Sequence, residues 1–154
     1  MITYFAPAPI VGKELRRYFL EHVEPDRRQY VVTKPLHVFK IAYTGKHGLV
    51  LVNLVIPIGA RINAPKKVFT ALPEYDRAKR KMRASEAIVR SMHKCNWFHQ
   101  PLGKCSVAYS GQDSTFVYRP GETVKPKEGF DEQTTVCASG IHFFLNVIDA
   151  LDYT

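Results

Sequence analysis

The chain has 154 residues, of which 45% are apolar and 23% are charged, and its net charge is +8. This is the composition of one globular domain, and it excludes a disordered chain because enough apolar side chains are present to offset the entropy lost on ordering. No run of about 18 apolar residues occurs, so the sequence predicts no membrane span.

The N-terminal residues and the cysteine content indicate the compartment in which the protein is expected to work. Residues 1–5 lack the basic flank and long apolar core of a signal peptide. Three cysteines are an odd number, which is unusual in a secreted domain because one thiol stays unpaired. We therefore expect a protein that is not secreted and that stays in a reducing compartment.

The first half of the chain predicts a helix followed by strands. Residues 1–9 are expected to be extended. Apolar side chains recur at helical spacing over residues 10–23, and Pro25 ends the predicted helix. Residues 30–33 and 36–43 then show the composition of strands.

The strongest strand prediction is residues 49–56, which are β-branched and nearly all apolar. Such a run is typical of a central strand that is covered on both faces. The glycine-containing turn at 44–48 predicts that this strand forms a hairpin with residues 36–43. Breakers then make residues 57–73 irregular, 74–81 favours one or two helical turns, and 84–92 fits either a helix or a strand.

The last third predicts short elements. Residues 95–104 have the composition of a loop, 106–109 and 116–118 are expected to be short strands, and 123–126 a short extended piece. Residues 140–144 predict another strand, and Asn146 is placed to cap a final helix that ends at Tyr153. The whole pattern predicts a single compact α+β domain over 1–154, mostly antiparallel sheet, with an N-terminal helix and a short C-terminal helix.

Most of the positive charge lies between residues 61 and 83. Two acidic residues of this stretch oppose eight basic ones, which are Arg61, Lys66, Lys67, Arg77, Lys79, Arg80, Lys81 and Arg83. Such a patch favours an acidic partner, which is an acidic protein surface, non-specific nucleic acid or anionic lipid. Nucleic-acid binding would add aromatic side chains such as Phe69, Tyr75, Trp97 and Phe98. The alternative is a solvated loop that keeps the protein soluble.

A candidate pocket is indicated by Cys137, Gly140, His142 and Phe144. The segment predicts a tight turn that ends at Gly140, and then a strand in which His142 points away from its two neighbours. Cys137 and His142 have the residue types of a nucleophile and its base. The alternative is a buried thiol and a hydrogen-bonded core histidine.

A second constellation has the ligand types of tetrahedral zinc. It consists of His93, Cys95, His99 and Cys105. The paired cysteines of common zinc fingers are missing from these spacings. We therefore predict neither a metal site nor a cofactor.

Three blocks of the sequence resemble an uncharacterised domain of large nucleocytoplasmic DNA viruses and some phages. The blocks are residues 81–89, 116–124, and 130–132 with 137–144, and residues 51–61 match the earlier half of that domain. The resemblance covers roughly residues 36–154. It implies a viral protein with a compact α+β domain, located in the virion or the host cytoplasm, but it supplies no activity.

Residues 140–144 and the helix after them also resemble the ADP-ribosyltransferase fold. In that fold an aromatic side chain of this strand stacks on nicotinamide, and His142 stands where its tyrosine would be. The fold also needs a glutamate on a later strand, whereas Asp149 and Asp152 lie in the predicted helix. The resemblance implies, as an alternative, such an enzyme or a degenerate NAD pocket.

The function that these observations favour is a structural or interaction protein of a large DNA virus. It would be a minor capsid protein or another virion component that contacts a capsid protein, another viral protein or the genome through the basic stretch. A host-directed binding module is a further alternative. No complete catalytic constellation is visible in the sequence, which argues against an enzyme.

Overall fold

The computed structural model describes residues 13–45, 48–65, 68, 81–96, 100–111, 113, 115–130 and 140–152. The helices of this part are α1 (Lys13–Leu20) and α2 (Val147–Asp152). Its strands are β1 (Val23–Asp26), β2 (Gln29–Val32), β3 (Leu36–Thr44), β4 (Gly48–Ile56), β5 (Arg61–Asn63), β6 (Met82–Ala84), β7 (Ala87–Cys95), β8 (Pro101–Lys104), β9 (Ala108–Tyr109), β10 (Val117–Tyr118), β11 (Thr123–Val124) and β12 (Ile141–Phe143).

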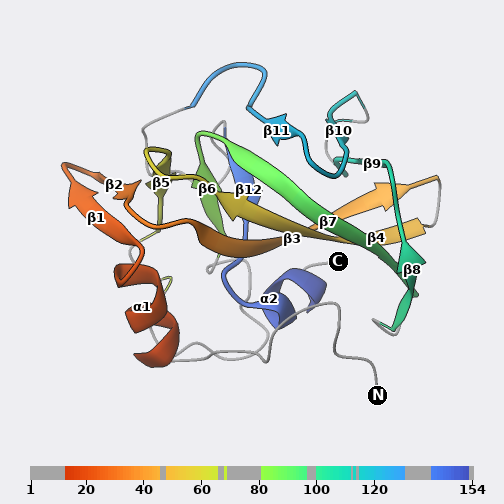
Figure 1. Cartoon of the computed structure of the whole chain (residues 1–154), viewed down its shortest axis with the longest axis horizontal. Coiled ribbons are helices and arrows are strands. Elements are labelled where there is room, and N and C mark those ends of the chain that lie inside the picture. The colour runs from red at the N-terminus through yellow and green to blue at the C-terminus, as the bar shows by residue number, and fades with distance from the viewer. Residues whose placement is uncertain are drawn as a thin grey trace.

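The long strands β3, β4 and β7 form the centre of a seven-stranded sheet (Figure 1). Its order is β10-β9-β3-β4-β7-β11, with β8 paired to β7. The predicted hairpin is confirmed, since β3 and β4 pair in register from Leu36 opposite Ile56 to Thr44 opposite Gly48. The predicted central strand is also confirmed, because β4 is hydrogen-bonded to β3 on one side and to β7 on the other.

A smaller sheet has the order β1-β2-β5-β6-β12. It meets the large sheet through Phe39 of β3 and Phe144, which follows β12. These two residues exchange two backbone hydrogen bonds of 2.8 Å. The fold is therefore α+β and mostly antiparallel, with a helix near each end, as the sequence predicts.

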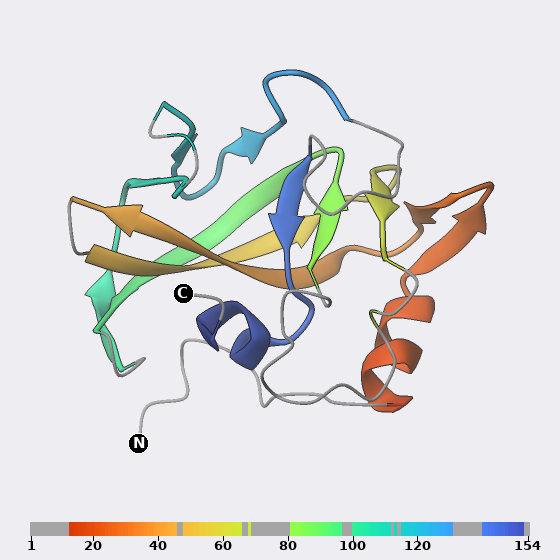
Figure 2. The same cartoon turned by 180° about the vertical axis from the view of Figure 1, so that it is seen from behind.

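Two apolar clusters hold these layers together. The larger one lies between the sheets and also takes Leu15 and Phe19 from α1. The smaller one lies on the other face of the large sheet, where Phe39, Leu49 and Leu51 pack with α2. Figure 2 shows α2 beneath the central strands from behind. Burial on both faces explains why β4 is nearly all apolar.

The helix predicted over residues 10–23 is wrong at its C-terminal end. It ends at Leu20, and Val23 begins strand β1, where it pairs with Val32 and is 4% exposed. Pairing and burial outweigh the helical pattern at this point. Pro25 is tolerated in β1 because this strand forms the edge of the small sheet.

Further segments form strands that the sequence did not predict. Residues 57–73 contain β5, and residues 95–104 contain β8. Residues 84–92, which fit either a helix or a strand, form most of β7. The C-terminal helix is confirmed, with its cap, because the backbone N–H of Ile148 donates to Oδ1 of Asn146 at 3.1 Å. No helix within the described ranges is long and apolar enough to cross a membrane.

Candidate functional site

Strand pairing brings two of the predicted sites together. Arg83 of the basic stretch lies on β6 and stands opposite His142 of the candidate pocket on β12. Directly opposed residues in an antiparallel pair are about 5 Å apart at their Cα atoms. The basic stretch and the glycine–aromatic strand therefore meet in one place, and we call Lys40, Lys81, Arg83 and His142 the junction cluster.

The lysines of the junction cluster are buried cations. Lys40 comes from β3, and its Nζ donates a hydrogen bond of 3.0 Å to the backbone oxygen of His142. Its ammonium group is enclosed, although the residue as a whole keeps some exposed surface. Burial, and to a smaller extent the charge of Lys81, lowers the pKa of Lys40 to about 8. Lys81 itself is only 5% exposed.

Arg83 is also internal, with 2% of its surface exposed. Its guanidinium lies 5.5 Å from the centre of the Phe130 ring, within the range of a cation–π contact. A Cβ atom added at Gly140 would stand 2.9 Å from the Cβ of Arg83. Gly140 therefore allows the chain that enters β12 to pass close to Arg83.

Phe144 of the predicted pocket belongs to the core, as does its neighbour Phe143. Phe143 is fully buried and Phe144 is 4% exposed. Phe144 packs in the smaller apolar cluster, together with α2. His142 is half-buried, and Cys137 lies outside the described residues.

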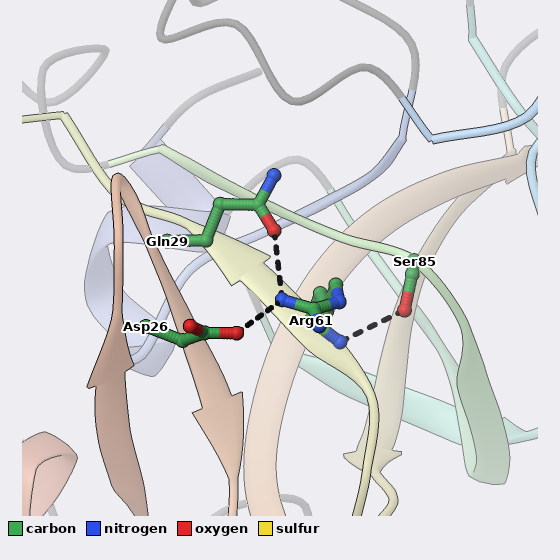
Figure 3. A network of polar contacts seen from close by, with 4 residues as sticks. All are labelled: Asp26, Gln29, Arg61 and Ser85. Atoms are coloured by element: carbon green, nitrogen blue, oxygen red, sulfur yellow. Dashed lines mark hydrogen bonds and ion pairs between the residues drawn. The ribbon is translucent and has the colours of Figure 1, made fainter.

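Arg61 has an internal role in the structure. Its Nη1 donates to Oδ2 of Asp26 at 2.8 Å and to Oε1 of Gln29 at 3.4 Å (Figure 3). Its backbone N–H donates to Oγ of Ser85 at 2.9 Å, and the Ser85 N–H donates to the Arg61 carbonyl at the same distance. Arg61 thus ties the β1–β2 hairpin to β5 and to the residue after β6.

The rest of the predicted basic stretch lies outside the described residues. This applies to Lys66, Lys67, Arg77, Lys79 and Arg80, and likewise to the aromatic residues Phe69, Tyr75, Trp97 and Phe98. Of the eight predicted partner-binding residues, three are described. Lys81 and Arg83 are internal, and Arg61 bridges strands.

Exposed arginines occur instead at the tip of the β1–β2 hairpin. Arg27 and Arg28 form its two-residue loop, since Asp26 pairs with Gln29. Both are exposed. Arg27 has a φ of 59°, which makes it the one positive-φ residue other than glycine among the described residues. Loops of this kind favour glycine, asparagine or aspartate there, so an arginine at this position is unusual.

The large sheet separates the two cysteines of the predicted zinc constellation that are described, and its His93 is buried on β7 beside Cys95. Cys95 belongs to the apolar cluster beneath α2, and Cys105 belongs to the cluster between the sheets. Burial raises the pKa of Cys95 to about 11, which makes it a poor thiolate ligand. His99 lies outside the described residues, and the part of the chain that is described contains no group of three potential metal ligands.

Two elements of this geometry were missed by sequence reasoning. Lys40 has a signal in the sequence, because strand alternation places it on the same face as Leu36, Val38 and Ala42, which are buried. Arg27 and Arg28 have a weaker signal in the sequence. The strands on either side of them have only four residues each, and β1 contains Pro25, so the hairpin is hard to recognise from the sequence.

Comparison with known proteins places the chain in a family. Residues 27–150 match the model of a family of unknown function (DUF5758). The match spans most of the chain, including the junction cluster and the hairpin tip, so the protein belongs to this family. Neither the curated proteins nor the solved structures gave a match.

Proposed function

We propose that this member of the family is a viral interaction protein that sits in the particle and binds an acidic protein surface through its hairpin tip. The observation that carries the proposal is the charge at the tip. Arg27 and Arg28 are exposed, while the adjacent carboxylate of Asp26 is turned towards Arg61. The acidic group adjacent in sequence is thus already paired with Arg61, and the two guanidinium groups remain available to a partner.

The position of the hairpin supports this assignment. It stands at one end of the molecule, away from the centre of the large sheet (Figure 1). Arg61 contacts both Asp26 and Gln29, the pair that closes the loop, so the tip is held directly beside its two arginines. An arginine held at a positive φ is a backbone cost of the kind that functional sites retain.

The wider surface is also basic. Among the described residues, eleven exposed lysines and arginines face six exposed aspartates and glutamates. The two signs are interspersed, as at Glu24 beside the hairpin tip. A mixed surface suits a protein partner better than a phosphate backbone, which would repel the acidic side chains.

The viral setting is supported by the sequence blocks described above. The blocks at 81–89, 116–124, and 130–132 with 137–144 all lie inside the matched region, and they are the residues that resemble the domain of large DNA viruses. An interaction protein at the particle surface or beneath the capsid is consistent with a small basic domain of this kind.

Quantitative mass spectrometry of purified particles against infected-cell lysate tests the proposal. We expect the protein in particles at a fixed ratio to the major capsid protein. Virus carrying Arg27→Gln with Arg28→Gln should lose that ratio, whereas the matched variant Arg16→Gln with Arg17→Gln on α1 should keep it. Absence from particles with abundance in lysate would overturn the proposal. If the protein is absent from particles that lack genome, its partner in the particle is nucleic acid and not a protein.

A further inference from the structure

Four polar residues form a patch on the three central strands of the large sheet. They are His37 on β3, Asn53 on β4, and Arg90 and Ser91 on β7, and we call them the central patch. The strand register puts Asn53 opposite Phe39 and Ser91, and it puts His37 opposite Val55. This face is covered by α2 further along, but His37 and Arg90 are exposed.

A β-bulge positions the arginine. Asn53 pairs with Ser91 and Leu54 pairs with Val89, so Arg90 is the extra residue of β7. Its Nη1 lies 3.1 Å from Nδ1 and 3.2 Å from Nε2 of His37. The two side chains therefore meet across the intervening strand β4. Bulges that redirect a side chain in this way are frequent beside binding sites.

The patch presents donors. Nδ2 of Asn53 donates to Oγ of Ser91 at 3.0 Å, which leaves the serine hydroxyl hydrogen free to donate. A neutral imidazole can accept one hydrogen bond from Arg90, and a guanidinium has five N–H donors, so further donors of Arg90 remain for a ligand. Guanidinium, hydroxyl and amide donors on rigid strands are the groups that bind phosphate oxygens.

The surrounding charge also favours an anion. The strands β3, β4 and β7 contain no aspartate or glutamate. The pKa of His37 is lowered by partial burial, and then by the charge of Arg90 and by the neighbouring His22. The side chain of Glu122, whose backbone bonds to β7, lies 3.8 Å from Arg119. An anion on the patch would thus meet cations and would relieve their mutual repulsion.

We propose that the central patch binds a phosphoryl-type oxyanion, with Arg90 as the principal contact and with His37, Asn53 and Ser91 around it. The ligand is either free phosphate or a phosphorylated side chain, since both present the same oxygens. The proposal is independent of the hairpin tip, because the two groups of residues lie on different elements and different sheets.

NMR titration of the full chain tests this site at constant ionic strength. Millimolar inorganic phosphate should shift the imidazole signals of His37 and raise its pKa by roughly one unit, because a nearby anion favours the charged form. Arg90→Gln should weaken phosphate binding roughly tenfold, and Arg90→Lys should restore part of it. Lys94→Gln removes the same charge from an exposed position on the same strand and is the matched control.

The outcomes separate clearly. Equal weakening by Arg90→Gln and Lys94→Gln would mean that net charge alone is sensed, and it would overturn the proposal. An unchanged His37 spectrum with phosphate would do the same. A short phosphoserine peptide that binds much more tightly than inorganic phosphate, with its unphosphorylated form inactive, would assign the site to a phosphorylated side chain. Equal affinity would assign it to free phosphate.

Discussion

Replacing Lys40 with methionine is expected to change how the stability of the protein depends on pH. The pKa of Lys40 is lowered from its ordinary value of 10.5 to about 8, by burial and by Lys81. At a pH between these two pKa values, Lys40 holds its proton in the unfolded chain and has released it in the native protein. The unfolded state then binds more protons, so the free energy of unfolding rises with pH through this window.

The size of the effect follows from the gap of about 2.5 between the two pKa values. That gap corresponds to about 3 kcal/mol of stability lost at pH 7, of which about 2 kcal/mol is recovered by pH 9.5. Methionine has no proton to release. The variant also leaves the His142 carbonyl without its donor at a cost of about 1–3 kcal/mol, but this cost does not vary with pH.

Urea unfolding of both proteins at pH 7 and pH 9.5 measures the difference. The stability of the wild type relative to Lys40→Met should increase by about 2 kcal/mol between the two conditions. Lys34→Met makes the same chemical change at an exposed position, and its curve should stay parallel to that of the wild type. If Lys40→Met is parallel as well, to within about 0.5 kcal/mol, the reasoning from burial is refuted.

Three further predictions concern packing and pairing. Cys95 is buried and its pKa is raised to about 11, so a disulfide reagent should modify it only when the protein unfolds. If mass spectrometry maps rapid labelling of the native protein to this thiol, its burial is contradicted. Gly140→Ala should lower the free energy of unfolding by about 1–3 kcal/mol, because the new Cβ would lie 2.9 Å from the Cβ of Arg83. An unchanged denaturant unfolding curve would show that β12 can shift to make room for it. A double-mutant cycle of Arg61→Met with Asp26→Asn should give a salt-sensitive coupling of about 0.5–1 kcal/mol, since both side chains are more than 40% exposed, and zero coupling would leave the hairpin held by its backbone alone.

The elements predicted correctly are those with local signals. The β3–β4 hairpin has long runs of strand residues around a glycine turn, and the last helix has an asparagine at its start. In each case the residues that define the element lie next to it in the chain. The fold class followed because these local elements already implied an antiparallel sheet with few helices.

The missed strands depend on distant partners. β5 and β6 have three residues each and β8 has four, which is too short for a strand period to be seen. β5 exists because β2 and β6 lie on either side of it. The pairing of Arg83 with His142 was beyond sequence reasoning for the same reason, and so the basic stretch and the pocket were treated as separate sites.

Positive charge in this protein has to be sorted by location before it can indicate a partner. The sequence assigned its densest basic stretch to a surface, yet Lys81 and Arg83 of that stretch are internal. The charge of Lys81 contributes to the lowered pKa of Lys40, and the Cβ of Arg83 limits the space at Gly140. By contrast, the arginines at positions 27 and 90 looked unremarkable in the sequence, and a hairpin loop and a β-bulge expose them. The two binding proposals rest on those arginines, because backbone geometry, and not the local density of charge, decides which cations a partner can reach.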